Sequence, residues 1–164
     1  MLSALEQKRV WEGLLAAEIR GNYFADLCGR YQLKQRLLTW ATLLFSSGAL
    51  ATLISDWVPH NLAWIRPVLA FFTVALSLWS LTAKNERNSI DCSDLHFKWN
   101  TLGREFEDLW DDMYAQVAAA KLRELEKRAA EYSRTGTSFP NRRRLMIKWQ
   151  EHVEQHRRQL PAIS

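Results

Sequence analysis

The stretch that decides the fold covers residues 66–84 and reads RPVLAFFTVALSLWSLTAK. Between its two terminal cations, residues 67–83 carry no charge. A second uncharged stretch of 19 residues, LLTWATLLFSSGALATLIS at residues 37–55, precedes it. A helix needs about 20 apolar residues to cross a bilayer. The two stretches therefore predict two membrane-spanning helices, the second of which begins at Leu62 if Arg66 extends its side chain to the interface.

A composition with 24% charged residues would by itself indicate an ordinary soluble protein, but the apolar residues are concentrated between positions 37 and 83. The connecting residues 56–66, DWVPHNLAWIR, contain Pro59 and Asn61 as turn residues. Tryptophans mark the ends of this loop and the opposite ends of the two stretches: Trp40, Trp57, Trp64 and Trp79. Tryptophan is enriched where membrane meets water, which favours a membrane hairpin over a buried hairpin in a soluble helical bundle.

The distribution of cations predicts the orientation of the hairpin. The cations just before the first stretch and just after the second are Arg30, Lys34, Arg36, Lys84 and Arg87, whereas the connecting loop offers only Arg66 beside Asp56. Because cytoplasmic segments are enriched in Lys and Arg, we expect both termini in the cytoplasm. The first 36 residues contain many charges and no apolar region of the signal-peptide type. Cys28 and Cys92 then lie on the reducing side and are expected to be free thiols.

The expected fold class is all-α: a two-transmembrane helical hairpin with long N- and C-terminal cytoplasmic helices in a homo-oligomeric bundle. An N-terminal amphipathic helix is expected over residues 1–36 and is expected to run directly into the first apolar stretch. The hairpin covers residues 37–83, and a cytoplasmic helical region covers residues 84–164. In that region the break SRTGTSFPN separates a long helix over 84–133 from a closing helix over 141–158.

Apolar residues recur at alternating spacings of three and four in the expected long helix. They are Leu95, Trp99, Leu102, Phe106, Leu109, Met113, Val117 and Ala120. Such a row requires a partner helix. Two partners remain open, the N-terminal helix of the same chain and a helix of another copy in a coiled coil.

Charge is uneven along the C-terminal region. Residues 100–120 carry a net charge of −4, and residues 121–164 carry +6. Basic side chains near aromatic rings are typical of nucleic-acid sites, because cations attract phosphates while bases stack on rings. The candidate nucleotide-binding residues are Arg123, Lys127, Arg142, Arg143, Arg144, Lys148 and Trp149. The alternatives are a solvated helix face and contact with anionic lipid headgroups.

Catalytic and metal-binding signals are weak, so we expect no enzyme, no cofactor and no metal site. Cys92 and His96 are one helical turn apart, but a reactive thiol needs a pocket and an oriented base, and a structural role is expected. His152 and His156 share a helix face without the Glu that follows the first His in the zincin motif. The glycines are scattered, and no phosphate-binding glycine loop exists.

The order of the segments resembles a known family. The segments are the basic amphipathic helix EIRGNYFADLCGRYQLKQR (18–36), the two-span hairpin, the helix NERNSIDCSDLHFKWNTLGREFEDLW (85–110) and the closing helix RRRLMIKWQEHVEQH (142–156). This layout resembles the SLATT domain, found in two-transmembrane effectors of bacterial antiphage systems that accompany nucleotidyltransferases. The resemblance covers nearly the whole chain and rests on layout and helical texture, not on an invariant motif.

The resemblance implies a pore-forming antiphage effector in the bacterial inner membrane, assembled as a homo-oligomer, with a tetramer as the expected assembly. It also implies that a nucleotide or short single-stranded oligonucleotide from a partner nucleotidyltransferase controls the pore. In the branch called Hailong, which a stand-alone chain of this size resembles most closely, the signal is a deoxyadenylate oligomer. That oligomer keeps the channel shut until infection removes it.

A pore needs several copies of this chain, because two helices cannot enclose a water path. Small and hydroxylated residues recur at helical spacing between the cations of the second stretch. The candidate pore-lining residues are Arg66, Ala70, Thr73, Ser77, Ser80 and Lys84. The competing interpretation is that these small residues let helices pack closely in lipid. A second small face on the first stretch consists of Thr39, Thr42, Ser46 and Ala49.

Two other functions also remain open. One is a non-conducting oligomeric membrane scaffold, and the other is a membrane-anchored nucleic-acid-binding protein. A channel predicts ion flux, whereas neither alternative does.

Overall fold

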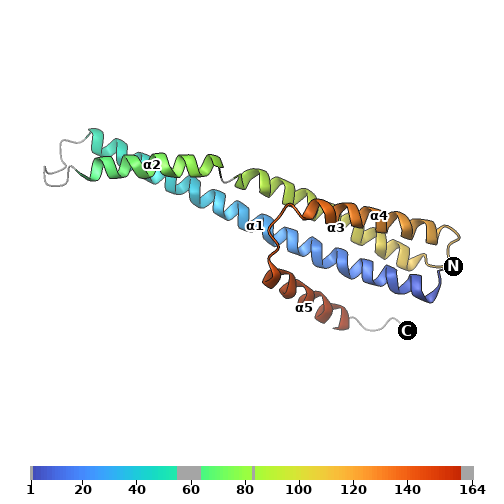
Figure 1. Ribbon diagram of the computed structural model, residues 1–164. Helices are drawn as coiled ribbons and strands as arrows, with labels where there is room; N and C mark the ends of the chain where they lie inside the picture. Colours follow the sequence, from blue (N-terminus) through green and yellow to red (C-terminus); the bar gives the residue numbers. More distant parts are fainter. Residues whose placement is uncertain (1, 55–63, 83, 160–164) are drawn as a thin grey trace. The chain divides into compact units, whose positions relative to one another are not determined.

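The computed structural model describes residues 2–54, 64–82 and 84–159 (Figure 1). Within these ranges the chain is all-α, with five helices and no strand. The helices are α1 (Ala4–Ile54), α2 (Ile65–Thr82), α3 (Asn85–Asp111), α4 (Ala118–Gly136) and α5 (Arg143–Gln159). The all-α fold class expected from the sequence is confirmed.

The chain divides into two compact units. The first, called the helical bundle below, comprises Met1–Leu27 and Asp91–Ser164. The second, called the helix pair, comprises Cys28–Ile90. Helices α1 and α3 contribute residues to both units, so the limits between the units fall inside helices and not at residues 36/37 and 83/84.

The apolar row of α3 packs on α1 of the same chain. Its buried members are Leu95, Trp99, Leu102, Phe106 and Leu109, and the buried residues of α1 include Val10, Leu14, Ala17 and Leu27. The two helices are antiparallel, because Gly13 lies against Phe106 while Gly21 lies against Asn100. Of the two partners left open for this row, the structure therefore has the N-terminal helix of the same chain.

The other two helices of the bundle also lie along α1 (Figure 1). Contacts between side chains fix their directions: Arg9–Glu126 and Arg20–Ser133 for α4, and Asp26–Lys148 and Glu18–Arg157 for α5. Helix α4 is therefore parallel to α1, and α5 is antiparallel to it. Arg157 also lies 2.9 Å from Glu107 of α3, so this one guanidinium connects three helices. Helix α1 is the central helix of the bundle.

The prediction of one long helix over residues 84–133 is wrong, because the structure has two helices there. Helix α3 ends at Asp111, and the backbone turns before α4 begins at Ala118. Acidic side chains at the end of α3 oppose the helix dipole, which favours termination there. Val117, expected in the apolar row, lies in this turn and is 68% exposed. No glycine or proline lies between these helices, so the usual breaker residues are absent from this turn.

The helix pair contains the later part of α1 and all of α2. Phe45 of α1 and Phe72 of α2 stack with ring centroids 5.9 Å apart, so the two helices lie side by side. The prediction that the N-terminal helix continues into the first apolar stretch is confirmed, since α1 extends to Ile54. Helix α2 ends at Thr82, and Lys84 has a φ of 45° outside any helix.

Parts of both predicted spans lie outside the described residues. These parts are residue 55, residues 62 and 63, and residue 83, together with the connecting residues 56–61. The side chains of Arg66, Ser80 and Ala49 also lie outside what the structure describes. Within the described ranges, no helix has both the length and the apolarity needed to cross a membrane.

Gly13 allows the close approach of α1 and α3, and replacing it should destabilise the bundle. A Cβ atom at Gly13 would lie 2.6 Å from the ring of Phe106, which is only 1% exposed and has no room to move. Overpacking costs about 1–3 kcal/mol, whereas alanine gains at most about 1 kcal/mol in helix propensity. Gly13→Ala should therefore lower the Tm measured by circular dichroism.

Gly29→Ala is the matched control, because a Cβ atom at Gly29 would have no neighbouring atom within 4 Å. Only helix propensity acts there, so its Tm should stay the same or rise. Equal increases in Tm for both variants would contradict the close packing at Gly13.

Candidate ligand-binding site

The structure divides the predicted nucleotide-binding residues into two groups. Arg123 and Lys127 are exposed on α4, near Glu126, which pairs with Arg9 of α1. The other five residues lie at the start of α5, where Arg142 contacts Tyr23 of α1. At 1.5 Å per residue, Arg9 and Tyr23 are about 20 Å apart along α1. The two groups therefore do not form one compact site.

Two members of the α5 group already have partners. The ammonium group of Lys148 lies 3.3 Å from a carboxylate oxygen of Asp26. It also lies 4.7 Å from the ring centroid of Trp149, whose ring meets His152 edge-on at 5.3 Å. Lys148 therefore lies over one face of Trp149, the ring on which a base was expected to stack.

Arg142, Arg143 and Arg144 remain as candidate phosphate contacts. Arg143 and Arg144 are exposed, and neither forms an ion pair within the described ranges. Arg142 is half-buried, and its Nε is a buried donor without an acceptor in the part of the chain that the structure describes. Within the α5 group, these three cations stay available to an anion.

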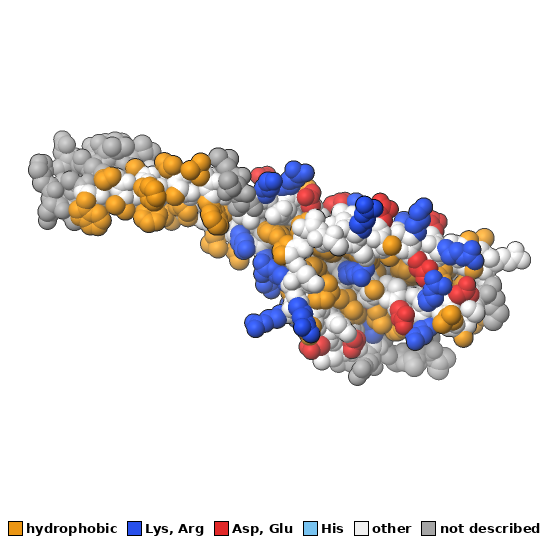
Figure 2. All heavy atoms as spheres, viewed as in Figure 1, with side chains coloured by type: hydrophobic (Ala, Val, Ile, Leu, Met, Phe, Trp, Pro, Cys, Tyr) orange, Lys and Arg blue, Asp and Glu red, His pale blue; other side chains and the backbone are white. Residues whose placement is uncertain are grey.

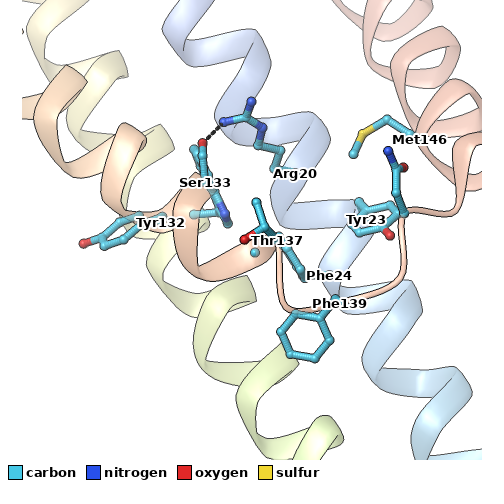
Figure 3. A pocket seen from close by; sticks show the side chains of 11 residues that line it. Arg20, Tyr23, Phe24, Tyr132, Ser133, Thr137, Phe139 and Met146 are labelled. Atoms are coloured by element: carbon cyan, nitrogen blue, oxygen red, sulfur yellow. Dashed lines mark hydrogen bonds between the residues drawn. The ribbon is translucent and has the colours of Figure 1, made fainter.

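The bundle contains a partly open cavity of about 300 Å³ that the sequence did not reveal (Figure 3). Helices α1, α3, α4 and α5 and the segment between α4 and α5 all contribute to its lining. The aromatic part of the lining consists of Tyr23, Phe24, Trp99, Tyr132 and Phe139, and the polar part includes Arg20, Ser133, Thr137 and Asn141. The cavity is therefore mostly aromatic with one cation.

The end of α4 and the hydroxyl of Tyr23 shape this cavity. Helix α4 stops at Gly136, where an added Cβ would lie 3.1 Å from the ring of Phe24. The following segment is attached to α1, since the Tyr23 hydroxyl donates to the carbonyl of Pro140 at 3.0 Å and accepts from the backbone N–H of Arg142 at 3.3 Å. The ring of Phe139 meets Phe24 edge-on at 6.0 Å.

Arg20 is the charged group of the cavity. Its Nη1 donates to the Ser133 hydroxyl at 2.6 Å, and its guanidinium lies 4.7 Å from the ring centroid of Trp99. No carboxylate pairs with Arg20 in the described ranges. Burial lowers the pKa of Arg20 because the charged form loses water. Figure 3 shows Arg20 reaching from α1 to Ser133 of α4.

Two other half-buried arginines of the bundle, Arg128 and Arg157, have carboxylate partners. Arg128 forms a two-fold contact with Glu105, and Arg157 lies 2.9 Å from both Glu18 and Glu107. The hydrogen bonds that Arg128 donates to Glu105 raise the pKa of Arg128. Arg20, like Arg142, is partly desolvated without a carboxylate partner among the described residues. Of these two arginines, Arg20 is the one that lines the cavity.

The residues considered for catalysis have structural partners. Cys92 is fully buried. His96 Nδ1 lies 2.8 Å from the carbonyl oxygen of Gly21, and its Nε2 lies 3.1 Å from the side-chain nitrogen of Asn100. Both ring nitrogens of His96 are thus engaged with groups other than the thiol. Among the described residues, no cluster of three His, Cys, Asp or Glu residues could hold a metal ion.

The predicted pore-lining residues belong to the helix pair. Their row on α2 does not continue to Lys84, where it was expected to end. Ala70 is exposed, while Thr73 and Ser77 are half-buried on α2. The Ser77 hydroxyl donates to the backbone carbonyl of Thr73 at 2.8 Å. Lys84 lies beyond the end of α2 with a left-handed backbone, so it does not extend the helical face. Its place in the pore lining stays a prediction.

Sequence reasoning missed Arg20 because it considered only the C-terminal cations. Arg20 is separated from Ser133 by more than a hundred residues, and only the packing of α4 on α1 brings the two together. A weak signal was present: Arg20, Tyr23 and Phe24 lie three and four positions apart and therefore share one helix face.

No protein family, no curated protein and no solved structure matches this chain.

Removing the Tyr23 hydroxyl should loosen the segment between α4 and α5. Tyr23→Phe deletes both hydrogen bonds of this hydroxyl, and each contributes about 1 kcal/mol. We expect the free energy of unfolding in urea to fall by about 1–2 kcal/mol. Tyr114→Phe is the control because Tyr114 is 68% exposed. Equal stabilities of the two variants would show that the hydroxyl does not hold this segment.

Proposed function

We propose that this protein is an oligomeric ion channel whose helix pair spans a membrane and whose opening is controlled by a nucleotide or oligonucleotide. The observation that carries the proposal is the exposed apolar surface of the helix pair. The exposed large side chains include Leu37, Trp40, Leu43, Leu44, Phe71, Phe72, Val74, Leu78 and Trp79. On the face shown in Figure 2, hydrophobic side chains cover the described part of α2 with no charged side chain among them.

This apolar surface points in more than one direction. Leu43 and Leu44 are 55% and 68% exposed, and Phe71 and Phe72 are 70% and 48% exposed. Consecutive residues of a helix point about 100° apart, so a single flat partner would leave part of this surface in water. A lipid bilayer contacts a helix pair from all sides. Large exposed apolar patches mark membrane or protein contacts.

The hydroxyl groups of the helix pair also suit a membrane. Thr39 and Thr42 donate to the backbone carbonyls four residues earlier, at 3.0 and 2.9 Å. Ser46, Ser47 and Ser77 likewise donate to carbonyls of their own helices. A hydroxyl in lipid has no water to bind, so these internal bonds remove the cost of placing each group there. This feature supports the membrane proposal.

A pore requires several copies, each contributing one helix face. We propose the small face of α2 with Ala70, Thr73 and Ser77 as the lining. The small face of α1 with Thr39 and Thr42 then packs against it. Both faces lack large side chains, and small residues allow close contact of helices in lipid.

The remaining elements of the proposal come from the resemblance to the SLATT domain. They are a homotetramer in the bacterial inner membrane with both termini in the cytoplasm, a role in antiphage defence, and a partner nucleotidyltransferase that makes the signal. Gating requires the signal to bind one pore state better than the other. Helix α1 belongs to both units, so a ligand that rearranges the bundle acts on a helix that also contributes to the helix pair.

Ion flux from proteoliposomes tests the channel directly. The purified chain in liposomes should release an entrapped ion, and Ser77→Leu should abolish or strongly reduce the flux, because a bulky side chain would narrow the lining. Val74→Leu is the control, since it adds one carbon to the same helix on a side chain that is already 59% exposed. A scaffold or a membrane-anchored nucleic-acid binder would show no flux in any variant.

If the wild-type chain conducts and Ser77→Leu leaves the flux unchanged, the small face of α1, and not that of α2, lines the pore. Crosslinking should show the same oligomer for the wild type and for both variants, so that lost flux reports on the pore and not on assembly.

The exposed cations of α5 should bind the phosphates of a single strand. Arg143→Glu with Arg144→Glu should weaken the binding of an oligodeoxyadenylate by about tenfold or more. The slope of log affinity against log salt should become shallower by about 0.7 per lost contact. Lys8→Glu with Arg104→Glu is the control, because it changes net charge equally at exposed positions of the bundle. If both double substitutions weaken oligodeoxyadenylate binding equally, the effect comes from net charge alone and the site at Arg143 and Arg144 is contradicted.

A further inference from the structure

We propose that the cavity around Arg20 is a binding pocket for one nucleotide, with Arg20 contacting the phosphate and the aromatic lining contacting the base. The inference rests on the proposed function for the choice of a nucleotide among aromatic anions. The cavity lies entirely within the helical bundle. It is therefore distinct from the helix pair, and the exposed cations Arg143 and Arg144 are not among the residues that line it.

Most hydrogen-bond donors of the Arg20 guanidinium have no partner among the described residues. A guanidinium has five N–H donors, and only Nη1 has a hydrogen-bond partner among the described residues, the Ser133 hydroxyl. The Nε and Nη2 atoms are not among the fully buried atoms that lack partners, so they remain accessible. Ser133 donates its own proton to the carbonyl of Ala129 at 2.7 Å, which directs its lone pairs to Arg20. Arg20 is thus positioned but not neutralised.

The charge of Arg20 has no counter-charge beside it within the described ranges. A partly desolvated cation without a counter-charge raises the free energy of the folded state. The indole Nε1 of Trp99 is a buried donor, and no acceptor for it lies within the described part of the chain. Trp99 also lines the cavity. The cavity is thus lined by Arg20, whose charge has no carboxylate partner in the described ranges, and by Trp99, whose indole donor has no acceptor there. A bound anion would neutralise Arg20 directly.

The size and the aromatic lining of the cavity suit a nucleotide. A volume of about 300 Å³ is at the lower end of the range for small-molecule sites. It suits one nucleotide and not a folded oligomer. Phe24, Phe139 and Tyr23 supply ring surfaces for a base, and the amide of Asn141 can both donate to and accept from a base edge. A free inorganic anion would leave this aromatic surface unused.

The pocket and the exposed cations can act on the same ligand. A nucleotide at the end of a strand would enter the cavity, while Arg143 and Arg144 would contact phosphates outside it. Asn141 lines the cavity and Arg143 begins α5 two residues later, so the two sites are adjacent along the chain.

Isothermal titration of the full chain in detergent, with adenosine monophosphate as the probe, tests the pocket. The wild type should bind adenosine monophosphate more tightly than adenosine or inorganic phosphate, because only the nucleotide uses both Arg20 and the rings. Arg20→Gln should weaken this binding by about tenfold or more. Arg104→Gln should leave the affinity within about twofold, because Arg104 is exposed and does not line the cavity.

A second pair of variants avoids any effect of Arg20 on folding. Thr137→Trp places a large ring at an exposed residue of the lining, and it should block binding of adenosine monophosphate. Ser138→Trp is the control, because Ser138 is exposed and does not line the cavity. Equal affinities for Thr137→Trp and Ser138→Trp would overturn the pocket, as would the absence of any binding to the wild type.

The pocket and the channel fail separately in these experiments. If wild-type proteoliposomes conduct ions but the substitutions of Arg20 and Thr137 leave the affinity for adenosine monophosphate unchanged, the proposed pocket is wrong and the proposed channel stands. If both substitutions remove binding but no ion flux occurs, the pocket stands and the channel is wrong.

Discussion

The close packing of α3 on α1 is the contact on which the rest of the bundle depends. An added Cβ at Gly13 would lie 2.6 Å from the ring of Phe106, and one at Gly21 would lie 2.5 Å from the side-chain oxygen of Asn100. This packing buries Trp99 against the face of α1 that carries Arg20. Helix α4 can then run parallel to α1 and bring Ser133 to the guanidinium. The cavity is a consequence of these contacts and not of any single loop.

Charge pairing divides the arginines of the bundle by role. Arg157 and Arg128 hold helices together, because each has carboxylate partners on a neighbouring helix. Arg20 contributes a hydrogen bond and a cation–π contact, and neither neutralises its charge. A protein that only needed a structural contact here could use an apolar or neutral side chain at lower desolvation cost. The retained charge is most simply explained by an anion that arrives from outside.

Much of the fold could be predicted from the sequence. The three-and-four spacing of Leu95, Trp99, Leu102, Phe106 and Leu109 predicted a helix with a buried row, and the glycine and proline of residues 133–141 predicted the break before α5. The turn between α3 and α4 could not be predicted, since it depends on α4 finding room along α1 and not on breaker residues. Local patterns do not report such a tertiary effect.

The candidate site was predictable only in part. Exposed cations such as Arg143 and Arg144 can be recognised from composition, because solvated charges need no partner. The partners of Lys148 could not be found this way, since its contact with Asp26 joins residues 122 positions apart. The same holds for Arg20 and Ser133, which are 113 positions apart. Long-range packing decides which basic residues are neutralised and which remain available.

The apolar surface of the helix pair links the fold to the proposed function. Leu44, Phe71 and Trp79 are each more than 60% exposed, and water is an unfavourable environment for such a surface. The central claim is that lipid covers it. An alkaline carbonate wash of membranes from expressing cells tests this claim most directly: the account predicts that the chain stays in the membrane pellet as an oligomer. Recovery of a dissolved monomer in the supernatant would contradict it.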